Sequence, residues 1–325
     1  MKSLSNCRIG AGPMSKNVVD ACISFSNSTG RPLLLIPSRN QVDYDYGYSN
    51  HWISRTLSQY VQQRTSLIHL MRDHGGPGQG RTEDDGIMSL AADCMYFDLI
   101  HVDPWKVATC LKDGADITAA LIKRCFGISP SIRYEIGTEE AIWPYTPEDL
   151  EGLIVRLKRA LLPVEFKQIA YAVIQTGTGL HGTANIGQFS RSRLRHMVQV
   201  CQEHGLMAKV HNGDFLPPAV VREHFKMGVS AINVAPELGQ IETRTYLECM
   251  DTSLRAAFHE MCFKSKRWVR WLGPDGGSLD DIMLVSGHYL FSHPDFIVHI
   301  RPNLSPDIDR EVQDRVVARL SELHE

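Results

Sequence analysis

Three histidines could bind a metal ion. His74, His181 and His211 each come just after a short apolar segment, and Gly182 and Gly213 lie beside two of them. Three imidazoles with one open position form a recognised catalytic zinc site. One histidine alone more often forms an ordinary hydrogen bond, so the hypothesis requires that all three meet. The pattern predicts one Zn²⁺ per chain, with other divalent metals as alternatives. The two glycines are candidate substrate contacts, because glycine permits close approach.

The elements that must position these histidines are short apolar runs alternating with longer amphipathic segments. Eight runs are predicted strands: 7–10, 32–36, 67–71, 99–102, 132–136, 169–175, 206–211 and 230–234. Predicted helices between them include 88–97, 107–125, 147–162 and 190–205. Alternation of strand and helix predicts a parallel sheet, and eight such units predict an α/β fold of the (β/α)8 TIM-barrel type.

The C-terminal part of the chain has a different pattern. Helical segments are predicted at 237–263, 277–291 and 306–324. No linker or low-complexity segment separates them from the barrel. We therefore expect one domain over residues 1–325, with a helical C-terminal extension at about 252–325.

Further polar residues fall where a barrel enzyme carries its active site, at the carboxyl ends of the strands. Asp73 ends the third predicted strand, Asp103 follows the fourth, Glu135 lies in the fifth and Asn233 in the eighth. Asp103 is a candidate substrate contact. It could also hold a ligand histidine in one tautomer, or be an internally satisfied barrel acid.

Composition excludes several classes of protein. A net charge of -3 and the absence of a basic run with interleaved aromatics argue against nucleic-acid binding. Neither a signal peptide nor a run of about 20 apolar residues is present, so no membrane association is expected. The eight cysteines are scattered and form no CxxC pair, a pattern typical of reduced thiols and of a cytoplasmic location.

Two other motifs suggest different chemistry. Gly177–Gly182 matches the dinucleotide-binding pattern GxGxxG, but it follows the sixth strand and the acidic Glu203 lies within a predicted helix. Lys209 lies two residues before His211 and could form a Schiff base, or be a barrel lysine neutralised by an acid. Neither reading displaces the metal hypothesis.

Several motifs resemble class II ketose-bisphosphate aldolases, which are zinc-dependent. They are Asp73-His74, Gly177-Thr178…His181-Gly182, His211-Asn212-Gly213, Glu135-Ile136-Gly137 and the segment Gly228–Leu238. The resemblance covers roughly residues 8–240. Asn27-Ser28-Thr29, Asn40-Gln41-Val42 and Ile136-Gly137-Thr138-Glu139 resemble the branch that contains the tagatose-bisphosphate aldolase subunit described as non-catalytic.

The resemblance implies reversible aldol cleavage of a sugar or sugar phosphate. It implies zinc ligands at the three histidines, a general acid/base at Asp73, a helper near the metal at Glu135 and a ketose contact at Asn233. The alternatives are a retro-aldol sugar epimerase and a non-catalytic subunit. A homo-oligomer is expected, with a second aldolase subunit as a further partner.

The chain departs from the family at the phosphate site. Asp214 and Pro236 stand where the family usually has a small residue and a threonine. An aspartate repels phosphate, and proline lacks both hydroxyl and N–H. The basic segment 264–268 could supply the anion contact instead, although we expect it to be a solvated helix face.

Overall fold

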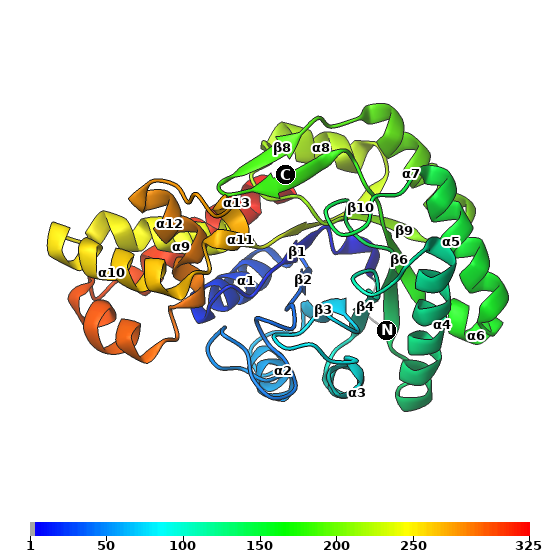
Figure 1. Cartoon of the computed structure of the whole chain (residues 1–325), viewed down its shortest axis with the longest axis horizontal. Coiled ribbons are helices and arrows are strands. Elements are labelled where there is room, and N and C mark those ends of the chain that lie inside the picture. The colour runs from blue at the N-terminus through cyan, green and yellow to red at the C-terminus, as the bar shows by residue number, and fades with distance from the viewer. Residues whose placement is uncertain (1–3) are drawn as a thin grey trace.

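Eight parallel strands form a closed barrel in the computed structural model, which describes residues 4–325 (Figure 1). Around the barrel their order is β1 (Ile9–Ala11), β10 (Val229–Val234), β9 (Met207–Val210), β6 (Ile169–Val173), β5 (Arg133–Ile136), β4 (Leu99–Val102), β3 (Ile68–Gly75) and β2 (Leu33–Leu35). Each predicted strand overlaps one of these, so the predicted (β/α)8 barrel is confirmed. The strands are short and apolar because both of their faces are covered.

Helices surround the barrel, and all of them except α9, which follows the last strand, connect one strand to the next. They are α1 (Lys16–Thr29), α2 (Ser54–Gln62), α3 (Ile87–Tyr96), α4 (Leu111–Ile128), α5 (Pro147–Ala160), α6 (Pro163–Phe166), α7 (Arg191–Glu203), α8 (Pro218–Lys226) and α9 (Pro236–Cys249). The start of α5 shows why they begin where they do. The Thr146 hydroxyl accepts the Asp149 N–H, the Asp149 carboxylate accepts the Thr146 N–H, and Pro147 occupies the first turn.

A β-hairpin that the sequence pattern did not predict stands on the barrel mouth. Strands β7 (Thr178–His181) and β8 (Ala184–Gly187) pair antiparallel across the tight turn at Gly182, whose φ is +57°. The side-chain amide of Asn185 donates to the carbonyls of Asn212 and Asp214, at 3.0 and 2.9 Å. The hairpin is thereby tied to the loop that follows β9.

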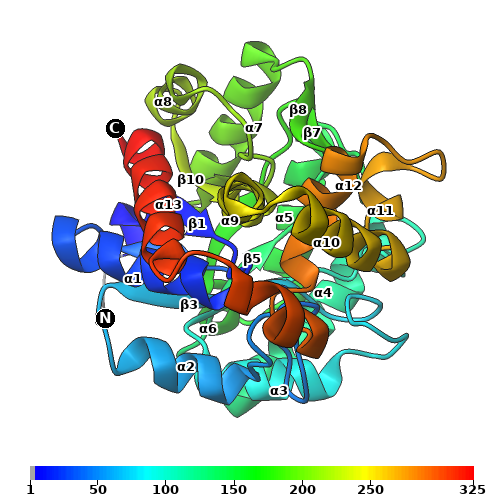
Figure 2. The same ribbon diagram turned by 90° about the vertical axis from the view of Figure 1, so that its left-hand side faces the viewer.

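Four more helices lie to one side of the barrel (Figures 1 and 2). They are α10 (Thr252–Ser265), α11 (Val269–Leu272), α12 (Leu279–Ser286) and α13 (Ile308–His324). The segment predicted as helical at 237–263 is helical, but it forms two helices. Its two parts, α9 and α10, are separated at Met250, and Asp251 caps α10 by accepting the Leu254 N–H. Because α13 returns to pack on α1 and α9, we propose that the chain is one domain.

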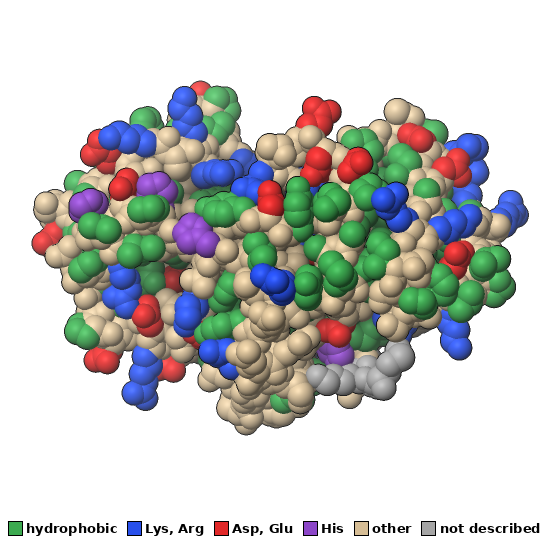
Figure 3. Space-filling view, turned by 90° about the horizontal axis from the view of Figure 1, so that it is seen from below, with side chains coloured by type: hydrophobic (Ala, Val, Ile, Leu, Met, Phe, Trp, Pro, Cys, Tyr) green, Lys and Arg blue, Asp and Glu red, His purple; other side chains and the backbone are tan. Residues whose placement is uncertain are grey.

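No helix within the described residues is long and apolar enough to cross a membrane. The face seen in Figure 3 carries Lys and Arg side chains interspersed with Asp and Glu. That face has no continuous basic surface of the kind that binds nucleic acid.

Candidate functional site

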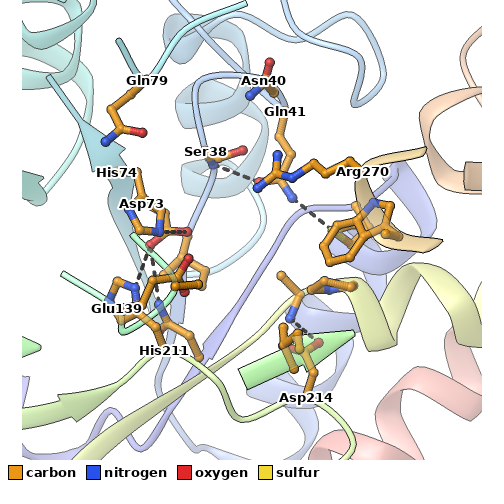
Figure 4. A pocket seen from close by; sticks show the side chains of 18 of the residues that line it. Ser38, Asn40, Gln41, Asp73, His74, Gln79, Glu139, His211, Asp214 and Arg270 are labelled. Carbon is orange, nitrogen blue, oxygen red and sulfur yellow. Dashed lines mark hydrogen bonds and ion pairs between the residues drawn. The ribbon is translucent and has the colours of Figure 1, made fainter. Parts of the chain in front are cut away.

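A pocket of about 490 Å³ opens at the carboxyl ends of the strands, where barrel enzymes carry their active sites. Asp73, His74 and His211 lie on one side of it (Figure 4). Residues of the α10–α11 segment, among them Arg270 and Trp271, line another part. The pocket therefore lies between the barrel mouth and the C-terminal helices.

An irregularity at the end of β3 brings two neighbouring side chains to the pocket. Arg72 pairs with Ile100 and Gly75 with Val102, so β3 contains one residue more than β4 between these positions. Such an irregularity re-aims side chains that would otherwise point to opposite faces. His74 has φ of +49°, a conformation that is strained for a side-chain-bearing residue. Asp73 and His74 consequently both line the pocket.

Three imidazoles meet beside Asp73, and each is tethered through one ring nitrogen. The Nδ1 of His74 bonds to Asp103, the Nε2 of His101 to the Gly137 carbonyl at 2.9 Å, and the Nε2 of His211 to Glu135 at 3.0 Å. The ring centroids are 4.9 to 5.2 Å apart. With Asp73, the three offer ligand atoms that all lie within 4.8 Å of one another.

The second nitrogens of His74 and His211 face the carboxylate of Asp73. The Nε2 of His74 and the Nδ1 of His211 each lie 3.8 Å from a carboxylate oxygen of Asp73. The Nδ1 of His211 is buried without a hydrogen-bond partner in the described part of the chain, and that of His101 accepts one long bond of 3.3 Å from the His74 N–H. A metal-binding histidine commonly has its other nitrogen bonded to a carboxylate or carbonyl, so these residues fit a metal ion.

Burial and nearby charges shift the pKa values of two of these histidines in opposite directions. Burial lowers the pKa of His74, but the carboxylates of Asp73 and Asp103 outweigh it and raise the pKa to about 10. Burial lowers the pKa of His101 to about 4, against the opposite influence of Glu135. The two neighbouring acids therefore make His74 the basic member of the pair.

Glu135 and Lys209 form a buried ion pair inside the barrel, 2.9 Å between Nζ and Oε2. Burial would raise the pKa of Glu135, but the positive charge of Lys209 and the His211 bond hold it well below its usual range. Glu135 bonds to His211 from inside the barrel and does not line the pocket. Lys209 is fully buried, the arrangement expected of a barrel lysine neutralised by an acid.

The other predicted contacts lie at different depths. Asn233 lines the pocket, and its amide approaches Asp73 at 3.5 Å. Asp103 is fully buried and bonds to the Nδ1 of His74, so it is placed to orient that ring. Gly213 is packed against β10, since an added Cβ would lie 2.2 Å from Ile232. Gly182 is at the hairpin turn, with its carbonyl bonded to Gln240.

His181, the third zinc ligand expected from the sequence, lies outside the imidazole cluster. It ends β7 at the tip of the hairpin and is exposed, and it is not among the residues that line the pocket. His101 is present instead, within β4 and in register with Glu135 of β5. The signal available for His101 was a polar residue inside an otherwise apolar strand, which has to be accommodated in the barrel interior.

The fold of this chain is similar to that of several solved structures. A protein described as a probable tagatose 6 phosphate kinase from Sinorhizobium meliloti 1021 has a TM-score of 0.75 and 18% identity, covering 97% of this chain and 93% of its own. The YdjI aldolase from Escherichia coli K12 has 0.58 and 10%, covering 98% and 92%. The fructose-bisphosphate aldolase from Campylobacter jejuni has 0.59 and 11%, covering 98% and 90%.

Two of these structures are named aldolases, so the predicted resemblance to aldolases is confirmed at the level of the fold. Neither a model of a known protein family nor a curated protein sequence matches the chain. Identities of this size carry no residue roles from those proteins to this one.

Proposed function

We propose that the chain is a metal-dependent aldolase that binds one Zn²⁺ through His74, His101 and His211. The observation that carries the proposal is the convergence of the three rings: each is tethered through one nitrogen, and with Asp73 they offer ligand atoms within 4.8 Å of one another. Three histidine ligands are a known catalytic zinc arrangement. Zinc would supply a Lewis acid that stabilises the negative charge left when the carbon–carbon bond of a ketose breaks.

Asp73 is suited to carry the proton. In cleavage it takes the proton of the substrate hydroxyl next to the breaking bond, and that carbon becomes an aldehyde. The bonding electron pair stays on the ketone fragment, which then takes up a proton. Asp73 lies at the cluster and lines the pocket, as a general acid/base requires. Asn233, on the same pocket wall, is placed to contact the ketose.

A cytosolic location is part of the proposal. All eight cysteines are free thiols in the structure, and unpaired cysteines are usual in reducing compartments.

The test is cleavage of ketoses and ketose phosphates by zinc-loaded protein, followed through the aldehyde released. We expect His74→Ala and His211→Ala each to lower the rate at least about 100-fold, because losing a ligand or its orientation typically costs that much. His196→Ala, on the exposed face of α7, is the matched control. If the two ligand variants were as active as the control, the protein would not be a metal-dependent aldolase.

A further inference from the structure

The wall of the pocket provided by the C-terminal segment is strongly cationic. Lys266, Arg267 and Arg270 line it, and Lys106, from the loop after β4, lines the same cavity. None of the four has an ion-pair partner within residues 4–325. Four unpaired positive charges around one cavity repel each other, so an anion bound among them would be stabilised by all four.

Local structure holds these side chains at the pocket. Lys266 ends α10 with φ of +55°, which turns the chain sharply into α11. The guanidinium of Arg267 then lies 5.3 Å from the ring centre of Tyr289, and that of Arg270 lies 5.4 Å from Trp271. Figure 4 shows Arg270 extended into the cavity. Stacking of this kind limits where the two charges can go.

Lys106 approaches from the barrel side. Its pKa is lowered by burial first and by the charge of Arg270 next, so the two cations are close enough to influence each other. Lys106 and Arg270 belong to elements far apart in the sequence, and the fold brings them to one cavity. Lys266 and Arg267 of segment 264–268 are exposed, as expected of a solvated face, but they also line the cavity. Lys264 pairs with Glu260 on the surface.

A second place where an anion could bind, the start of α9, is already occupied by side chains of the protein. Oδ1 of Asp214 accepts the backbone N–H groups of Ala235 and Glu237, at 2.9 and 2.8 Å. The carboxylate of Glu237 accepts the Phe215 N–H at 2.7 Å. Backbone N–H groups at the start of α9 would otherwise attract an anion. Because those donors are occupied, the cationic wall is the better candidate for an anion site.

We propose that the substrate carries a terminal anionic group, phosphate or carboxylate, bound by Arg267 and Arg270 with Lys106 and Lys266. Its reacting end lies at the imidazole cluster. The proposal rests on the proposed function for the reaction, while anion binding itself does not depend on metal. It names the substrate class as an acidic sugar derivative and gives the C-terminal extension a part in recognising it.

Binding can be tested by calorimetry with three probes: ribose 5-phosphate, gluconate and neutral ribose. We expect Arg270→Gln and Lys106→Gln each to weaken binding of at least one anionic probe about tenfold or more, and to leave ribose unchanged. Lys264→Gln is the matched control, an exposed cation of the same segment, and should bind like wild type. The anion that responds identifies the group as phosphate or carboxylate.

Binding of both anions that is no tighter than that of ribose, or that is unchanged in Arg270→Gln and Lys106→Gln, would overturn the proposal. The variant His74→Ala/His211→Ala keeps this test separate from the proposed function. It should lose zinc and still bind the anionic probe. If the protein showed no aldolase activity but still bound the anion in a way that depends on Arg270, the proposed reaction would be contradicted and the anion site would not.

Discussion

Asp214 is an acid whose surroundings favour its neutral form. Burial raises its pKa to about 8, and the nearby carboxylate of Glu237 adds to the rise despite the two backbone N–H groups that Asp214 accepts. Its carboxyl group occupies the backbone N–H groups at the start of α9 that an external anion could otherwise bind. A protonated carboxyl here costs less than a buried charge.

The consequence is a dependence of stability on pH. The folded pKa is about 8 and the ordinary value is 3.8, so between these values the folded state binds the extra proton. Stability should therefore fall as pH rises from about 4 to 8, by at most about 1.4 kcal/mol per unit. In urea titrations from pH 5 to 9, the free energy of unfolding of Asp214→Asn should not show this decrease. Relative to the wild type, the variant should therefore become more stable as pH rises. Parallel curves for the two proteins would contradict the assignment.

The position of β3 depends on a buried ion pair. Arg72 donates from Nε and Nη2 to the two oxygens of Asp93 in α3, both at 2.7 Å, and both side chains are fully buried. Arg72 also donates to the carbonyls of Pro37 and Val42. One side chain thus connects β3, α3 and the segment after β2, directly before Asp73 and His74.

Removing one partner of this pair should be costly. Asp93→Ala leaves the Arg72 charge buried and uncompensated, which typically destabilises by about 3 to 5 kcal/mol. Asp116→Ala, which breaks the exposed Lys112–Asp116 pair, should have little effect. Both are measured by denaturant unfolding. The double variant Arg72→Met/Asp93→Leu should recover part of the lost free energy of unfolding. If Asp93→Ala destabilised the protein no more than Asp116→Ala does, the buried pair would not be structurally important.

At the scale of the whole molecule, the barrel could be predicted because its strands are local features. Each is a short apolar run, and Leu99–Val102 matches the prediction residue for residue. The hairpin could not be predicted in the same way, since Thr178–His181 and Ala184–Gly187 lack a buried face and are held by Asn185 and by backbone pairing.

The metal-site residues that could be predicted lie near the carboxyl ends of their strands. Asp73, His74 and His211 lie there, and the fold brings them together. His101 lies inside a strand and becomes visible only when β4 and β5 are placed side by side. Arg270 belongs to a helix outside the barrel repeat, and no local pattern indicates that this helix closes the pocket. These two residues could be assigned to the site only from contacts between segments that are distant in the sequence.

In the proposed metal site His101, and not His181, is the third histidine ligand beside His74 and His211. The direct measurement is zinc content and affinity of the wild type, His101→Ala and His181→Ala, each purified without chelator and titrated with zinc. We predict about one zinc per chain for the wild type and His181→Ala, and at least about tenfold weaker binding for His101→Ala. Full binding by His101→Ala together with loss in His181→Ala would contradict the account and return the third ligand to the hairpin.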